Sequence, residues 1–207
     1  MVRAHRHQFK LWGGHPAVDF VNTVRDWTAE PRQDYLGEFG DAVRFGVTAG
    51  LLNRADAALL RNRNSRKELK RLRELRLLLK GVFEQWVRGL TPSGEDLERL
   101  SRDFAEAARR TRLTVATRAR SSRVPARREV PAEGAGDAVL RLRIVEAAVA
   151  LIVSDQILRL KSCPTCGWFF LDTSKNGSRR WCSMRACGSI AKARSYYRRR
   201  KAAASRG

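Results

Sequence analysis

Four cysteines in this 207-residue chain have a spacing suited to binding a metal, in the pattern Cys163-x2-Cys166-x15-Cys182-x4-Cys187. A C-x2-C pair lets two thiolates reach one tetrahedral ion from a tight turn, and Pro164 and Gly167 suit such a turn. The spacing therefore predicts one bound Zn²⁺. Because four thiolates leave no open coordination position, we expect a structural ion and not a catalytic one.

Other uses of the cysteines stay open at this point. Cys163 and Cys166 could form a redox dithiol, although that motif is typical of a thioredoxin-like βαβ unit, which this sequence does not predict. The four thiols could also be metal-free core residues. Disulfides are disfavoured because the amino terminus lacks the apolar region of a signal peptide. No segment has the roughly 18 apolar residues of a membrane span, so we expect a cytoplasmic protein without a membrane partner.

The residues that follow the first cysteines are strongly basic. Positions 161–207 contain twelve Lys and Arg but a single acidic residue, Asp172, within a chain of net charge +21. Basic side chains on a helix can contact phosphates, release counterions and bind guanine. We expect these residues to bind nucleic acid: Arg179, Arg180, Arg185, Lys192, Arg194, Arg198, Arg199, Arg200 and Lys201.

Charge alone does not separate the candidate partners. Duplex DNA and structured RNA both satisfy it, and a module that docks a partner protein, with basic residues for solubility, is the alternative. A second basic region, residues 99–128, has ten arginines and two acidic residues. Its default interpretation is a solvated surface, and an accessory role in binding stays open.

A third cluster, His15, Asp19 and Asn22, lies near the amino terminus. His15 and Asp19 could act as an acid/base pair, and the three residues could bind a small-molecule effector. The better interpretation is structural, with the side chains bonded to the backbone of a turn. The chain has no phosphate-binding glycine loop with its lysine, no H-E-x-x-H and no nucleophile elbow. We therefore expect no catalytic residues and no enzyme.

Amphipathic helices must position these groups. The periodicity of apolar residues predicts three helices. The first covers residues 41–52 with Asp41 as its N-cap, and the second covers residues 67–90 with Arg and Lys facing solvent. The third runs from Ser93 to about residue 110. Residues 9–24 predict a strand, a turn, and a second strand or helical turn, and residues 113–117 predict a strand. A core helix over 137–160 should run directly into Cys163.

The zinc module has its own predicted elements. Asn176-Gly177 predicts a hairpin between residues 168–171 and 179–181. A basic helix should follow Cys187 and pack an apolar face on the hairpin aromatics, with Ala186, Ile190, Ala193 and Tyr197 on that face. The fold class is therefore α+β: a mostly helical N-terminal domain, residues 1–160, followed by a small treble-clef-like, four-cysteine zinc finger, residues 161–207.

Two segments of the chain resemble known families. The run CPTCGWFFLDTSKNGSRRWCSM that starts at Cys163, with Cys187-Gly188 and the basic helix, resembles the bacterial CGNR-type zinc finger. The run GHPAVDFVNT that starts at Gly14 resembles the ABATE domain that precedes this finger. The resemblance implies a stress-induced transcriptional regulator whose finger binds DNA, and whose front domain senses an effector or forms a homodimer. Ser189-Ile190 stands where the family name has Asn-Arg, which bears on the nucleic-acid contact.

Overall fold

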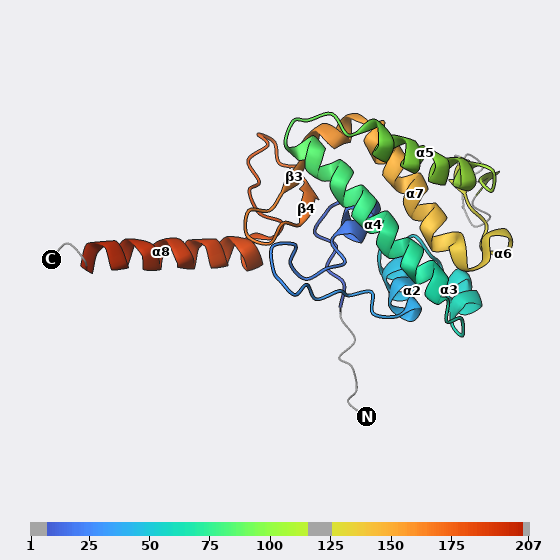
Figure 1. Ribbon diagram of the computed structural model, residues 1–207, viewed down its shortest axis with the longest axis horizontal. Helices are drawn as coiled ribbons and strands as arrows, with labels where there is room; N and C mark the ends of the chain where they lie inside the picture. Colours follow the sequence, from blue (N-terminus) through green and yellow to red (C-terminus); the bar gives the residue numbers. More distant parts are fainter. Residues whose placement is uncertain (1–7, 116–125, 205–207) are drawn as a thin grey trace, which may run out of the picture.

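The computed structural model describes residues 8–115 and 126–204, and most of them are helical (Figure 1). The elements, in chain order, are α1 (Pro16–Val21), α2 (Phe39–Thr48), α3 (Arg54–Leu60), α4 (Arg66–Val87), α5 (Gly94–Ala108), β1 (Arg112–Thr114), β2 (Arg127–Glu129), α6 (Ala132–Ala135), η1 (Gly136–Ala138), α7 (Val139–Ile152), η2 (Asp155–Arg159), β3 (Leu160–Ser162), β4 (Phe169–Leu171), η3 (Met184–Gly188) and α8 (Ser189–Ala204). The predicted α+β class is confirmed.

The core of the helical body, which runs from α1 to α7, forms where α1, α4 and α7 pack against one another. Their apolar stripes are buried, and the Phe20 ring lies 5.8 Å from that of Phe45. The same core continues into the zinc module, where Phe169 of β4 meets Phe83 of α4 edge to face at 5.7 Å. Burial of these side chains stabilises body and module together.

The helix starts follow the capping chemistry of the sequence. The Ser93 side chain accepts from the Asp96 N–H, as predicted for the start of α5. Asp41 is not the N-cap of α2, because Glu38 holds that position and Asp41 is its partner in a capping box. Helix α3 was not predicted, although its own capping box joins Asn53 and Asp56.

The longest helix, α4, matches its prediction but buries one charge that the pattern assigned to solvent. Arg76 is 4% exposed. Its guanidinium donates to both carboxylate oxygens of Asp34, at 2.8 and 2.6 Å, and to the Thr23 carbonyl oxygen. This ion pair fixes the loop between α1 and α2 against α4.

Two predictions at the ends of the body are wrong in part. Residues 9–24 form no strand among the described residues, and α1 is their one regular element. The core helix ends at Ile152 and does not run into Cys163, because η2 and β3 intervene and β3 pairs with β4. The predicted strand near Leu113 is confirmed as β1, which pairs with β2, whereas Thr117 lies outside the described residues.

The hairpin of the zinc module differs from the predicted one. β4 pairs with β3, so the turn that holds Cys163 and Cys166 forms the tip of the hairpin. Asn176-Gly177 does form a turn, with Gly177 at φ +59°. Residues 179–181 do not continue as a strand beside β4, because the Arg179 N–H donates to the Asp172 carboxylate at 3.0 Å.

The basic helix α8 is present but does not pack as predicted. It leaves the molecule as a single projecting rod (Figure 1). Ile190 is 45% exposed and Tyr197 is 67% exposed. The predicted apolar face therefore has no hairpin against it, and α8 is held at its start, where η3 carries Cys187.

Candidate metal centre and nucleic-acid interface

The four cysteines converge on one point, as the spacing predicted. All four are buried, and their sulfur atoms lie within 4.8 Å of one another. The Sγ atoms of Cys166, Cys182 and Cys187 are 3.5–3.6 Å apart, far beyond a disulfide bond of about 2.05 Å. Tetrahedral zinc with bonds of about 2.3 Å places its sulfurs about 3.8 Å apart. The geometry fits one structural Zn²⁺.

The electrostatics of the cluster also favour a bound cation. Hydrogen bonds from Cys166 and Cys182 lower the pKa of the Cys163 thiol. The pKa of Cys182 is raised, first because its thiol bonds to Cys163 and Cys166 and then because it is buried. Without a metal, the site therefore favours one thiolate and disfavours the others. A divalent ion removes this conflict, since it stabilises all four thiolates.

The body shapes the turn that carries the first two ligands. Gly167 has φ +71°, and a Cβ there would lie 2.9 Å from Cβ of Trp27, so the position requires glycine. The Trp27 N–H donates to the Cys166 carbonyl oxygen at 2.9 Å, and the Trp168 indole N–H donates to the Val24 carbonyl oxygen at 2.7 Å. The α1–α2 loop therefore positions the metal ligands.

The residues predicted as a candidate effector site have partners inside the protein. The Asn22 side chain donates to the Phe169 carbonyl oxygen and accepts from its N–H, at 2.8 and 2.9 Å. Asp19 accepts from the Gly13 N–H at 2.7 Å. His15 caps α1 by accepting from the Ala17 N–H at 3.3 Å. Asn22 thus acts as a link between body and module, a contact over 147 residues that the sequence could not indicate.

Burial perturbs two of these groups. It lowers the pKa of His15. It raises the pKa of Asp19 to about 7, although the Gly13 N–H and the nearby charge of Arg179 both lower it. At neutral pH the Asp19 carboxyl is therefore partly protonated, in a position between the amino-terminal loop and the zinc module.

Arg179, predicted to contact nucleic acid, has a structural position instead. Its guanidinium donates to the carbonyl oxygens of Trp181, Leu171, Trp12 and Cys182, and it lies 4.4 Å from the centre of the Phe170 ring. These bonds join the loop before Cys182 to the amino-terminal segment. We therefore leave Arg179 out of the interface.

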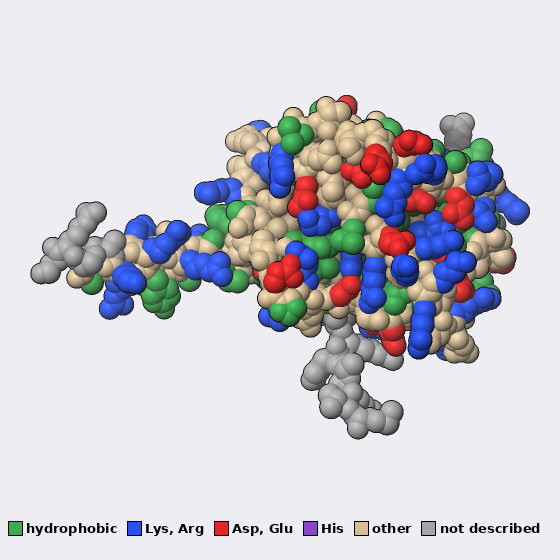
Figure 2. Space-filling view, viewed as in Figure 1, with side chains coloured by type: hydrophobic (Ala, Val, Ile, Leu, Met, Phe, Trp, Pro, Cys, Tyr) green, Lys and Arg blue, Asp and Glu red, His purple; other side chains and the backbone are tan. Residues whose placement is uncertain are grey.

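The other residues predicted to contact nucleic acid lie in a different environment. Arg180, Arg185 and the six basic residues of α8 are exposed, and no ion pair is found for any of them in the described part of the chain. Figure 2 shows blue side chains along α8 with no red ones among them, whereas both colours mix over the body. Zinc-bound Cys187, two residues before α8, orients this basic rod.

Comparison with known families agrees with the geometry. The model of the ABATE family, described as "Putative stress-induced transcription regulator", matches residues 14–155. The chain belongs to the ABATE family. The model of the CGNR zinc finger matches residues 159–200, which contain all four cysteines. No curated protein matches the chain significantly. The division of this ABATE protein near residue 160 stays a prediction, because one core spans both segments.

The departure from the CGNR name falls at the start of α8. Ser189 is the first residue of the helix, and its hydroxyl donates to the Met184 carbonyl oxygen at 3.2 Å. Ile190 follows as an exposed apolar side chain. The first turn of α8 in this ABATE protein therefore has no arginine, and its basic residues begin at Lys192.

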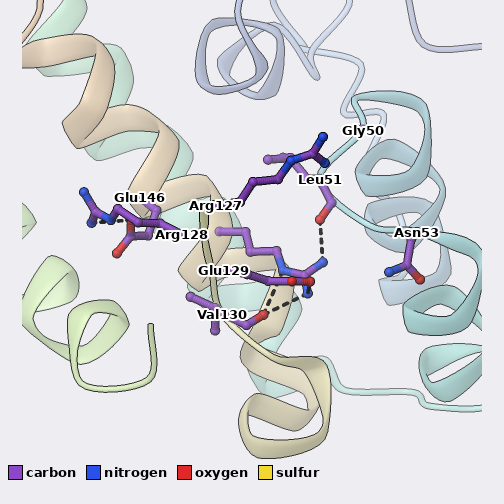
Figure 3. A pocket seen from close by; sticks show the side chains of 9 residues that line it. Gly50, Leu51, Asn53, Arg127, Arg128, Glu129, Val130 and Glu146 are labelled. Carbon is purple, nitrogen blue, oxygen red and sulfur yellow. Dashed lines mark hydrogen bonds and ion pairs between the residues drawn. The ribbon is translucent and has the colours of Figure 1, made fainter. Parts of the chain in front are cut away.

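A pocket of about 370 Å³ on the ABATE body shows how arginines are used there (Figure 3). Arg128 binds Glu146 at 2.6 Å, and Arg143 binds the Leu51 and Val130 carbonyl oxygens, both at 2.8 Å. Within the second basic region, Arg102 and Arg110 also pair with glutamates. These charges stabilise the body, and residues 116–125 of that region lie outside the described residues.

In residues 8–115 and 126–204, no helix is both long and apolar enough to cross a bilayer. The absence of a membrane partner stays a prediction.

Proposed function

We propose that this zinc-binding ABATE protein is a transcription regulator that binds duplex DNA through α8. The observation that carries the proposal is the projection of α8, whose six basic side chains have no acidic neighbour on the helix. Its 16 residues give a rod of about 24 Å. A major groove about 12 Å wide admits such a helix.

The zinc centre supports this role by holding the rod. Cys187 lies in η3, and the Ser183 side chain accepts from the Ala186 N–H at 3.3 Å to start that turn. A helix fixed at one end loses less conformational freedom on binding than a free basic peptide. Zinc is therefore structural, and the basic side chains make the contacts with phosphates.

The family description supports transcription regulation and a response to stress as parts of the same proposal. A small-molecule effector and a homodimer stay predictions. So do the absence of catalysis and the cytoplasmic location. RNA is the second candidate partner, because the charge of α8 suits both nucleic acids.

The test is a chain shortened to end at Ala191, which keeps the four cysteines and removes the basic part of α8. We expect full zinc content, an unchanged melting temperature and loss of duplex DNA binding at about 0.15 M salt. DNA binding at the affinity of the intact chain would contradict the proposal. Tighter binding of structured RNA than of duplex DNA, in direct competition, would favour the RNA alternative.

A further inference from the structure

An open hollow of about 580 Å³ lies between the turn that holds Cys166 and α8. Thr165 and Trp181 line it from the zinc-bound segments, and Arg194, Tyr197 and Arg198 line it from α8. Arg180 also lines it. The volume falls within the range of small-molecule sites, about 300–1,000 Å³.

The lining combines positive charge with aromatic rings. It has three arginines and no carboxylate, and we find no ion pair for these arginines in the part of the chain that the structure describes. Trp181 and Tyr197 add ring surface, and Thr165 adds a hydroxyl group. An anion alone would leave the rings unused, and an apolar ligand would leave the arginines unpaired. A nucleotide matches the lining, because its base can stack on the rings and its phosphate can pair with the arginines.

Part of the lining is held by contacts within the protein. The Arg180 guanidinium lies 5.1 Å from the centre of the Trp181 ring, and the Thr165 hydroxyl donates to the Cys187 carbonyl oxygen at 3.4 Å. Trp181 directly precedes Cys182, and Thr165 directly precedes Cys166, so zinc holds this wall in place. Tyr197, 67% exposed, offers the free ring surface.

We propose that this hollow holds one unpaired nucleotide of a bound strand, with its base against Tyr197 and its phosphates beside Arg194 and Arg198. The inference rests on the proposed function, nucleic-acid binding by α8. A base inside an intact duplex has both faces stacked on its neighbours and cannot reach the ring. A bulged or displaced base can, and stacking on an aromatic side chain strengthens binding.

Tyr196 and Tyr197 provide a matched pair for the test, because they are neighbours on α8 and only Tyr197 lines the hollow. The probes are a duplex of fixed sequence and the same duplex with one extra, unpaired adenosine, compared by fluorescence anisotropy. We expect the full-length protein to bind the bulged duplex about tenfold more tightly. Tyr197→Ala should remove this preference, and Tyr197→Phe and Tyr196→Ala should keep it.

The outcomes separate this inference from the proposed function. Tight binding of both duplexes with equal affinity would overturn the unpaired nucleotide and leave DNA binding intact, whereas no binding of either would overturn both. An equal loss on both duplexes in Tyr197→Ala would also overturn it. Equal affinity for the two duplexes, together with binding of adenosine monophosphate that Tyr197→Ala abolishes, would assign the hollow to a free nucleotide and overturn the strand-borne one.

Discussion

Arginines serve two different purposes in the body and in α8. In the body, Arg76, Arg141 and Arg143 are buried or nearly so, and each binds a carboxylate. On α8, the basic side chains lie in solvent beside other basic side chains. The number of arginines therefore does not distinguish the two regions, and the proposed nucleic-acid interface rests on the absence of carboxylates near the basic side chains of α8.

Arg179 shows that the two uses of arginine do not coincide with the boundary between the body and the zinc module. It belongs to the zinc module, yet its guanidinium binds backbone carbonyl oxygens as the buried arginines of the body do. Variants of the paired arginines, of the solvent-exposed arginines and of the zinc site that holds α8 should therefore differ in stability and in DNA affinity.

Loss of the zinc ion should have the largest effect, because it removes the anchor of α8 and part of the shared core. Cys166→Ser should lose zinc and a free energy on the order of 10 kcal/mol. Metal content and thermal unfolding measure this, with the exposed Lys175→Ala in the same module as control. A Cys166→Ser protein with full zinc and an unchanged melting temperature would refute the assignment of the site.

Removal of a buried arginine should cause the next largest loss of stability. Arg141 donates to Glu68 at 2.6 Å and to Glu106 at 3.0 Å. Arg141→Ala leaves two carboxylates without their cation and should lower the free energy of unfolding by about 3–5 kcal/mol. Arg102→Ala, at an exposed pair with Glu98, should cost less than about 1 kcal/mol in urea unfolding. Equal costs for the two variants would contradict the role of burial.

The pH dependence of stability tests the burial of the Asp19 carboxyl. The pKa of Asp19 is about 7 in the folded protein and about 3.8 in the unfolded chain. The folded state therefore binds the extra proton, and its stability from this group decreases as pH rises from about 4 to about 7, by at most about 1.4 kcal/mol per pH unit. Asp19→Asn should remove that slope. Parallel profiles of stability against pH for the two proteins would contradict the raised pKa of Asp19.

The smallest effect on stability should come from α8. Arg198→Ala removes an exposed side chain for which no ion pair is found within residues 8–115 and 126–204, so the free energy of unfolding should change by less than about 0.5 kcal/mol. Duplex DNA affinity should nevertheless fall, because a phosphate contact is lost. A large loss of stability would show that α8 packs on the body.

Local patterns in the sequence were enough for part of this structure. The cysteine spacing gave the metal site, the leucine periodicity gave α4, and Ser93 marked the start of α5. The short helix α3 was missed although its capping residues, Asn53 and Asp56, stand in the sequence at the required spacing.

The remaining features depend on contacts between distant residues. β4 pairs with β3, and Asn22 bonds to Phe169, because of packing that no local pattern encodes. The apolar positions of α8 suggested a buried face, but burial requires an opposing element, and Ile190 has none in the described structure. The hollow beside Trp181 likewise forms from segments that lie apart in the sequence.

The salt dependence of DNA binding tests most directly whether the basic residues of α8, and not those of the body, contact DNA. Two variants lose the same charge: Arg198, Arg199 and Arg200 changed to Ala on α8, and the exposed Arg54, Arg61 and Arg66 changed to Ala on the body. We predict that the slope of log affinity against log salt becomes shallower by up to about 2.7 in the α8 variant and is unchanged in the body variant. Equal slopes for the two variants would contradict a nucleic-acid interface on α8.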